Sequence, residues 1–128
     1  MRHFLLLLLS LCFINCYQVE RDCTEFKTGT FEFSYTVDGI EKTGKFVRTD
    51  RYNIDYFDNK IDSASVRWIN DCEFIQKELH PKNKDGQKAI HFKIISTTDD
   101  SYSFEYKLAA KDPYKKERVE KGTAKKID

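Results

Sequence analysis

The sequence predicts an all-β fold, a single small antiparallel meander of seven or eight strands, preceded by a signal peptide. Three observations predict it. Short segments alternate between apolar and polar residues, turn-forming residues separate them at intervals of roughly 8–12 residues, and an almost unbroken apolar run comes before them all. Beyond that run, no segment keeps a convincing helical period over three turns.

The first fifteen residues have the composition of a secretory signal. Met1 to His3 form a short basic start, and an apolar run follows from Phe4 to Ile14. Such a run is too short to span a bilayer, which takes roughly 20 residues, but it suits the apolar region of a signal peptide. A buried N-terminal helix or strand is the alternative, although five successive leucines suit few globular cores. We therefore expect residues 1–15 to direct the chain out of the cytoplasm.

Cys16 stands where the apolar run ends, in the sequence Phe13-Ile14-Asn15-Cys16. This stretch resembles a bacterial lipobox, in which the cysteine is acylated and becomes the new N-terminus, although Phe13 and Asn15 depart from the usual residues. Ordinary signal-peptidase cleavage is the alternative, but it requires small residues at those two positions. We predict a lipid on Cys16, a tether over residues 16–28, and a cell-envelope lipoprotein on the periplasmic or surface face of the outer membrane.

The four cysteines have different expected fates. Cys12 lies inside the signal and Cys16 carries the predicted lipid, which leaves Cys23 and Cys72. In an oxidising compartment, two remaining cysteines indicate one disulfide. Two reduced, partly buried thiols are the alternative.

The charge balance bears on the kind of partner. The chain has 22 Lys and Arg against 21 Asp and Glu, and loss of residues 1–15 removes Arg2 and no acid. The remaining chain is therefore formally neutral. Because phosphate binding needs a basic excess or a basic face, we expect no nucleic acid partner.

The strands are predicted from their period of two. Residues 30–37 alternate between polar and apolar without a break, and Asp38-Gly39 then forms a strong hairpin-turn dipeptide. We expect strands over 29–37, 43–49, 52–58, 63–69, 72–79, 88–97, 101–109 and 118–126.

Consecutive tight turns favour an up-and-down meander over residues 29–128. Eight such strands can close into a lipocalin-like barrel, wide enough for side chains or one small ligand, whereas an open curled sheet or a two-sheet sandwich is the alternative. We expect the apolar side of each strand, for example Tyr52, Ile54 and Tyr56, to fill the interior. Aromatic residues make up 14% of the chain, and we expect their rings to pack together rather than to surround a ligand.

No group of residues indicates catalysis or a metal. His80 and His91 have no cysteine or further histidine at ligand spacing, and no nucleophile motif or phosphate-binding glycine loop occurs. The segment 58–62 resembles a calcium loop but lacks its glycine and terminal glutamate. We expect a protein without enzymatic activity, metal or cofactor.

The candidate partner-binding residues are Arg48, Arg51 and Tyr52, because two guanidinium groups around a turn suit a carboxylate or phosphate. Our leading interpretation is a monomeric, lipid-anchored envelope protein whose β domain binds a protein or glycan partner. The alternative is a lipocalin-like carrier of a small apolar ligand. An unfilled aromatic cavity in a closed barrel favours the carrier, and a packed interior favours the first interpretation.

Three segments carry a family resemblance: 26–31 (FKTGTF), 46–50 (FVRTD) and 67–74 (RWINDCEF). In these the chain resembles a group of small, uncharacterised flavobacterial-type (Bacteroidota) lipoproteins, over nearly its whole length after the signal. Members of that group often carry the name "DNA topoisomerase IV". The resemblance implies an envelope lipoprotein. A topoisomerase needs an ATP-binding domain, an acidic magnesium cluster and several hundred residues, and none of these is found in this sequence.

Overall fold

The computed structural model describes residues 21–128, so the predicted signal peptide and Cys16 lie outside the described residues. Within that range the chain forms eight strands and two short 3-10 helices. The strands are β1 (Gly29–Val37), β2 (Ile40–Arg48), β3 (Tyr52–Phe57), β4 (Lys60–Asn70), β5 (Glu73–Glu78), β6 (Ile90–Thr97), β7 (Ser101–Leu108) and β8 (Glu120–Lys126). The 3-10 helices are η2 (Cys23–Phe26) and η3 (Asp85–Gln87).

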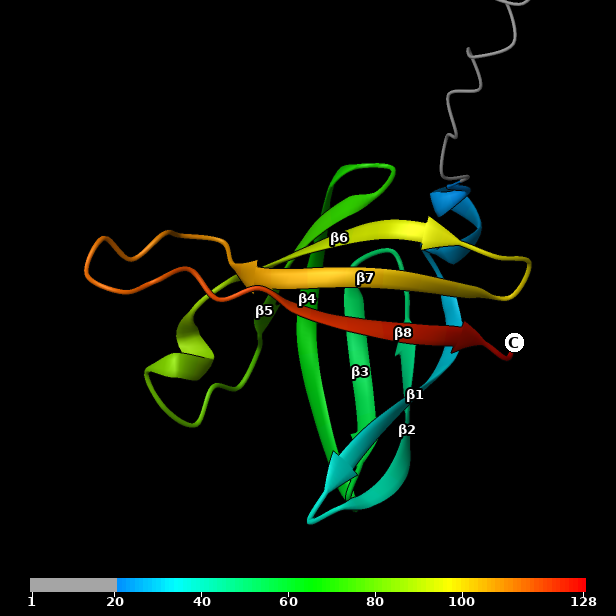
Figure 1. The fold of residues 1–128 in the computed structure, drawn as a ribbon, viewed down its shortest axis with the longest axis horizontal. Helices are drawn as coiled ribbons and strands as arrows, with labels where there is room; N and C mark the ends of the chain where they lie inside the picture. Colours follow the sequence, from blue (N-terminus) through cyan, green and yellow to red (C-terminus); the bar gives the residue numbers. More distant parts are fainter. Residues whose placement is uncertain (1–20) are drawn as a thin grey trace, which may run out of the picture.

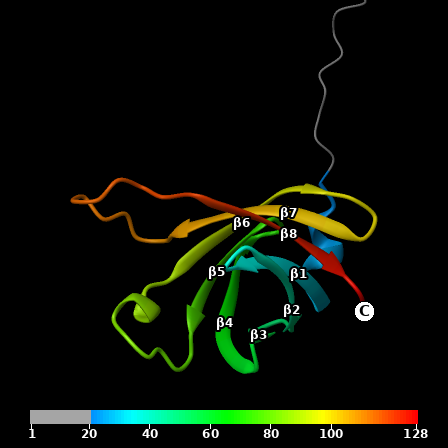
Figure 2. The same cartoon turned by 60° about the horizontal axis from the view of Figure 1, so that its bottom comes forward.

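The strands form a closed antiparallel barrel in which each pairs with the next in the chain (Figures 1 and 2). The last strand returns to the first, and Lys126 and Ala124 of β8 lie opposite Phe31 and Phe33 of β1. The predicted all-β meander is therefore confirmed, and it is a barrel rather than an open sheet or a sandwich. Closure leaves no sheet edge without a neighbouring strand.

Two tight turns have the geometry that β-hairpins prefer. Asp38 and Gly39 join β1 to β2 with φ angles of 52° and 76°, and Asp58 and Asn59 join β3 to β4 with φ angles of 51° and 57°. Positive φ at both central residues matches the right-handed twist of the flanking strands. Asp and Asn tolerate this conformation better than other side chains, so these dipeptides set the register of their hairpins.

The barrel has two different ends. One end, which we call the mouth, carries the β1–β2 and β3–β4 turns, which lie together at the bottom of Figure 1. There Lys42 Nζ lies 3.9 Å from Asp58 Oδ1. The β5–β6 and β7–β8 connections project to the left of the same view. At the opposite end, which we call the closed end, η2 lies beside the C-terminus, and Lys126 Nζ donates a hydrogen bond to the Glu25 carbonyl at 2.8 Å.

The closed end is a densely packed core. The ring of Phe26 in η2 is buried inside the barrel end, 5.4 Å from the ring of Tyr102. Phe31 and Phe46 stack on each other with centroids 4.9 Å apart. The buried residues of this cluster are Cys23, Phe26, Phe31, Phe46, Ile94, Tyr102 and Ala124. Burial of apolar surface contributes about 25 cal/mol per Å² to the free energy of folding, so this cluster stabilises the barrel.

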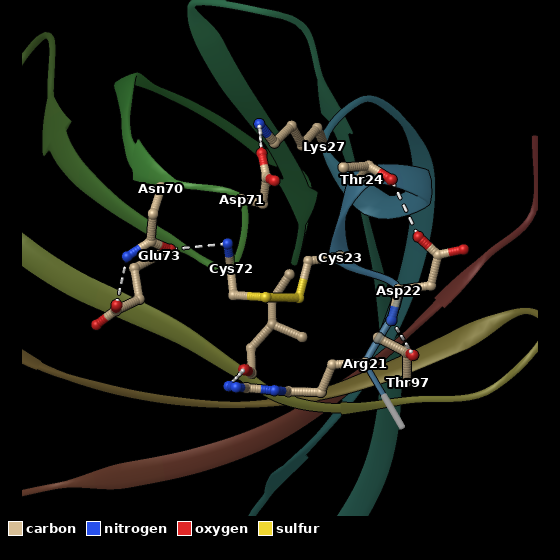
Figure 3. Close-up of a disulfide and its surroundings, with 11 residues drawn as sticks. Arg21, Asp22, Cys23, Thr24, Lys27, Asn70, Asp71, Cys72, Glu73 and Thr97 are labelled. Carbon is tan, nitrogen blue, oxygen red and sulfur yellow. Dashed lines mark hydrogen bonds and ion pairs between the residues drawn. A yellow bond between two sulfur atoms is a disulfide. The ribbon is translucent and has the colours of Figure 1, made fainter. Parts of the chain in front are cut away.

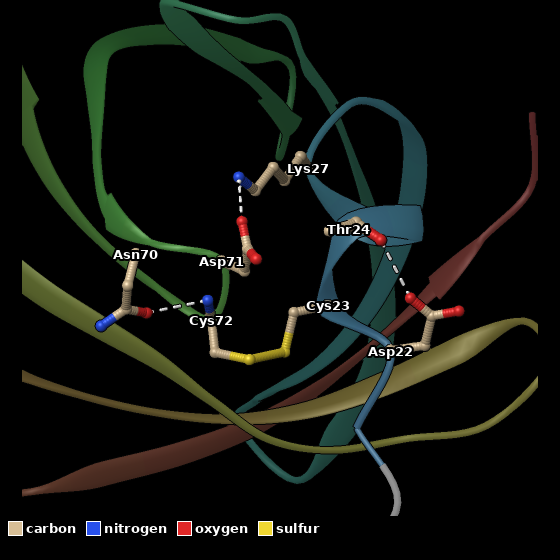
Figure 4. A network of polar contacts seen from close by, with 7 residues as sticks. All are labelled: Asp22, Cys23, Thr24, Lys27, Asn70, Asp71 and Cys72. Atoms are coloured by element: carbon tan, nitrogen blue, oxygen red, sulfur yellow. Dashed lines mark hydrogen bonds and ion pairs between the residues drawn. A yellow bond between two sulfur atoms is a disulfide. The ribbon is translucent and has the colours of Figure 1, made fainter.

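A disulfide between Cys23 and Cys72 fastens η2 to the β4–β5 turn, as predicted (Figure 3). Hydrogen bonds support both sides of it. Cys72 N donates to Asn70 Oδ1 at 2.9 Å, and Lys27 Nζ lies 2.9 Å from Asp71 Oδ1 (Figure 4). The segment that precedes β1 is therefore held across the closed end by one covalent bond and several polar contacts.

One strand faces the other way from our prediction. Tyr52 and Tyr56 of β3 are 46% and 42% exposed, whereas Asn53 is only 4% exposed and points inward with Asp55. The period of two is correct, but the polar side of this strand is the interior side. A period reports alternation and not direction, and the neighbouring strands decide which side is buried.

Candidate ligand-binding site

A cavity of about 610 Å³ occupies the mouth half of the barrel. Its volume lies within the usual range of small-molecule sites, roughly 300–1,000 Å³. Every strand contributes to its wall except β4. The lining residues are Phe33, Ser34, Tyr35, Phe46, Arg48, Asn53, Asp55, Phe57, Phe74, Gln76, Ile90, Phe92, Tyr102, Phe104, Tyr106, Lys121, Gly122 and Thr123.

The aromatic side chains divide the interior into a filled half and a hollow half. Rings that point inward at the closed end, such as Phe31 and Tyr102, are buried. Rings that point inward near the mouth, such as Phe33, Phe92 and Tyr106, are only half-buried although neighbouring strands surround them. In the mouth half, rings such as Phe92 and Tyr106 pack on their neighbours, as expected, but the space beside them is not filled.

Two glycines help to keep the cavity open. Gly44 lies opposite Phe33 across β2 and β1, and Gly122 lies opposite Phe104 across β8 and β7. A side chain at Gly122 would place its Cβ 2.6 Å from Phe104 Cζ, and one at Gly44 would overlap the Phe33 ring in the same way. Each ring thus lies over a glycine backbone, flat against the wall, as aromatic residues often do opposite strand glycines.

The floor of the cavity is formed by Arg48, which is 3% exposed. Its Nη2 and Nε donate to the carbonyl oxygens of Phe26 and Lys27 at 2.5 and 3.1 Å, and its Nη1 donates to Tyr102 Oη at 3.2 Å. The guanidinium carbon lies between 4.9 and 5.6 Å from the centroids of five rings, those of Phe31, Phe46, Trp68, Phe74 and Tyr102. Within residues 21–128 no carboxylate forms an ion pair with it.

This position of Arg48 corrects one part of the sequence prediction. Arg48, Arg51 and Tyr52 were expected to present a joint surface for a partner. Arg51 and Tyr52 are exposed, but the Arg48 side chain points into the barrel, where three of its five N–H donors are hydrogen-bonded. Arg48 ends an inward-facing alternation with Gly44 and Phe46, and it therefore closes the cavity floor instead of joining the surface turn.

Asp55 is the acidic group of the cavity wall. Its Oδ1 accepts a hydrogen bond from Asn53 Nδ2 at 3.0 Å. Burial raises the pKa of Asp55 from 3.8 to about 6, with a smaller contribution from Asp62, while Asn53 and Arg48 oppose the shift. The Asp55 carboxyl thus changes charge near neutral pH.

We expect the substitution Asp55→Asn to stabilise the protein above pH 6. The folded-state pKa lies above the ordinary value, so the folded protein binds this proton more tightly and loses stability as the pH rises from about 4 to 6. The shift corresponds to about 3 kcal/mol at most, and partial contact with water reduces it to about 1–3 kcal/mol. Urea unfolding of both proteins at pH 8 and pH 4 measures the difference, which should nearly disappear at pH 4.

The control is Asp99→Asn, in the exposed β6–β7 turn, which should leave stability unchanged at both pH values. An Asp55→Asn protein that is less stable than the parent at pH 8 would contradict this account of Asp55. It would mean that the carboxylate, through its attraction to Arg48, holds the barrel together.

Comparisons with protein-family models, with curated proteins and with solved structures find no match for this chain. Among residues 21–128 there is no group of three side chains suited to hold a metal ion. The same residues include no helix that is long and apolar enough to cross a bilayer.

Several residues of this cavity were not identified from the sequence. Asn53 and Asp55 looked like solvent-facing positions of an amphipathic strand, yet both line the interior, together with Gln76. One signal was present: Phe57 shares the side of β3 that carries Asn53 and Asp55, so that side was not uniformly polar. The disulfide residues Cys23 and Cys72 were identified correctly.

Proposed function

We propose that this protein binds a small, mainly apolar molecule inside its barrel and does not transform it. The observation that carries the proposal is the unfilled aromatic cavity of a closed barrel, with its few polar groups placed at the floor and on one wall. Ligand sites of soluble proteins combine these two features, an apolar wall that provides affinity and a small number of polar groups that orient the ligand. The cavity thus favours a carrier of a small ligand over a protein that binds a protein or glycan partner.

The cavity chemistry also supports binding without catalysis. Three of the five N–H donors of Arg48 bond two backbone carbonyls and one tyrosine, which fix the position of its guanidinium group. Asp55 has Asn53 as its hydrogen-bonding neighbour, and no histidine, cysteine or lysine of the cavity wall contacts it through a hydrogen bond. Nucleophilic catalysis usually pairs a nucleophile with a base within hydrogen-bonding reach, and the hydrogen bond from Asn53 to Asp55 is not a pair of this kind.

The predicted anchor forms part of this proposal. Cys23 follows Cys16 by seven residues, which span at most about 25 Å, and Cys23 lies at the closed end of the barrel. A lipid on Cys16 would thus place the closed end toward the membrane and the mouth away from it. The mass of the mature N-terminus tests the anchor, since an unmodified Cys16 would refute it.

Binding can be tested with the neutral apolar fluorophore N-phenyl-1-naphthylamine. We expect saturable binding with enhanced, blue-shifted emission, because the probe enters an apolar cavity. Gln76→Trp fills part of the lumen and should weaken binding at least tenfold. Lys77→Trp adds the same ring at the adjacent, exposed position of β5 and should leave the affinity within about twofold.

The outcomes separate the two interpretations. Absence of binding to the parent protein, with the fold confirmed by circular dichroism, would remove the carrier proposal. Equal loss of affinity in both tryptophan variants would also contradict it, because the probe would then lie outside the barrel.

A protein or glycan partner is the second candidate, and one observation favours it. Tyr52, Tyr56 and Ile61 are exposed along the outer side of β3 and β4, and the exposed fraction of Ile61 is 67%. Tyrosine is enriched at protein interfaces. Cross-linking in envelope extracts with Tyr52→Ser and Tyr56→Ser variants would identify such a partner, and an unchanged cross-linking pattern in both variants would dismiss this surface.

A further inference from the structure

The wall of the cavity has the chemistry of a site for an organic cation. Phe33, Phe57, Phe92, Phe104 and Tyr106 are half-buried rings on its inner side. The π-faces of such rings attract a cation through their quadrupole, and the attraction grows as the site loses water. An aromatic wall alone also suits neutral ligands. The charges near the wall therefore decide whether a cationic or a neutral ligand is preferred.

Asp55 provides the negative charge at this wall. Its Oδ1 accepts from Asn53, whereas no hydrogen bond to Oδ2 is found within residues 21–128. In the same range no buried side-chain oxygen or nitrogen lacks a partner. Oδ2 is therefore open to the cavity, where it can accept a hydrogen bond from an ammonium group or lie against a quaternary one.

The approach to Asp55 is also acidic. A smaller hollow of about 190 Å³ shares Asp55, Phe57, Gln76 and Ile90 with the main cavity, and its wall adds Asp62, Glu78 and Asp85. The one lysine of its wall is Lys88, whose Nζ lies 3.3 Å from Asp85 Oδ1. The hollow thus has more negative than positive groups, which attracts cations toward the cavity.

The positive groups of the main cavity do not cancel this preference. The Arg48 guanidinium lies at the floor, surrounded by rings and bonded to Phe26, Lys27 and Tyr102. Lys121 is exposed and lies opposite Glu105 in the β7–β8 register. The Arg48 charge acts on Asp55 from the floor, but no ion pair joins the two, so the Asp55 carboxylate stays available to a cationic ligand.

We infer that the ligand of this cavity carries a protonated amine or a quaternary ammonium group next to an apolar body, with the charged group at Asp55 and the body against the aromatic wall. The inference rests on the proposed binding function. It names the chemical class of ligand, an aromatic or aliphatic organic cation.

The test uses four probes with one apolar body and different charged groups: 4-phenylbutylamine, trimethyl(4-phenylbutyl)ammonium, 4-phenylbutan-1-ol and 4-phenylbutyrate. Calorimetric titration of the full mature protein at pH 7.5 compares them. We expect both cations to bind at least tenfold tighter than the alcohol, and the carboxylate to bind more weakly than the alcohol. In Asp55→Asn the advantage of the cations should fall below threefold, while the affinity for the alcohol stays within twofold.

Retained alcohol binding shows that the Asp55→Asn cavity is intact, and Asp99→Asn is the matched control, which should behave like the parent. Tightest binding of the carboxylate would overturn the inference and assign the charged group of the ligand to Arg48. Equal binding of alcohol and cations would overturn it too, but would leave the proposed function standing. Failure of all four probes and of N-phenyl-1-naphthylamine would remove both.

Discussion

Loss of the Cys23–Cys72 disulfide is expected to lower the free energy of unfolding by about 4 kcal/mol. The bridge joins residues 49 apart in sequence, and restricting a loop of this size in the unfolded chain contributes about that much in the chain-entropy model. A domain of this size is stable by about 5–15 kcal/mol, so the loss is a large fraction of the total. Urea unfolding of the double variant Cys23→Ala/Cys72→Ala measures it.

Reduction of the parent and of the double variant shows whether the loss of stability comes from the disulfide itself. Dithiothreitol should destabilise the parent protein by a similar amount and leave the double variant unchanged. We also expect the loss to affect the closed end first, because Phe26 follows Cys23 in η2 and packs against Tyr102. A double variant within about 1 kcal/mol of the parent would show that the packing of η2 holds this end without the bridge.

The second large effect is expected at the cavity floor, where Arg48→Met should lower the free energy of unfolding by about 2–4 kcal/mol. The substitution removes the donors to the Phe26 and Lys27 carbonyls and to Tyr102 Oη. Each buried acceptor left without a partner costs about 1–3 kcal/mol. Methionine keeps part of the contact with the rings and removes a buried charge, so the loss is smaller than the sum of the three hydrogen bonds.

Arg51→Met is the matched control, because Arg51 is an exposed arginine three residues along the chain, and it should change stability by less than about 0.5 kcal/mol. Chemical denaturation of both variants gives the comparison. If Arg48→Met is as stable as the parent or more stable, the charge is a net cost to folding. In that case the role of Arg48 lies in the cavity and not in the fold.

The fold was largely predictable from residues close together in sequence. The unbroken alternation of residues 30–37 and the Asp38-Gly39 dipeptide predict the first hairpin, which the structure contains as β1 and β2. The disulfide was predictable once two cysteines were set aside. These features follow from local periodicity and from the number of cysteines, and both can be read from one sequence.

The cavity was not predictable in the same way. Whether the barrel is filled depends on how far rings such as Phe33 and Phe104 lie from the opposite wall, and this follows from barrel closure and from Gly44 and Gly122 across the strands. Arg48 was assigned to the surface because it lies beside a turn with Arg51, and charged side chains are seldom fully buried. Its burial requires three acceptors brought together from η2, the residue after it and β7, which no local pattern reports.

Local sequence patterns also fail to predict the reversed orientation of β3. Apolar residues on one side of a strand usually indicate the interior, yet Tyr52 and Tyr56 lie outside and Asp55 lies inside. The inverted pattern of β3 is what places Asn53 and Asp55 on the cavity wall. Such a mismatch between pattern and burial is expected at functional sites, which agrees with the function that we propose.

We propose that a small molecule binds within the mouth half of the barrel, and intermolecular nuclear Overhauser effects between N-phenyl-1-naphthylamine and the protein would locate it. We predict contacts from the probe to ring protons of Phe33, Phe92 and Tyr106, and none to Tyr52 or Tyr56 on the outer wall. Contacts to the outer tyrosines without contacts to the three inner rings would contradict the claim.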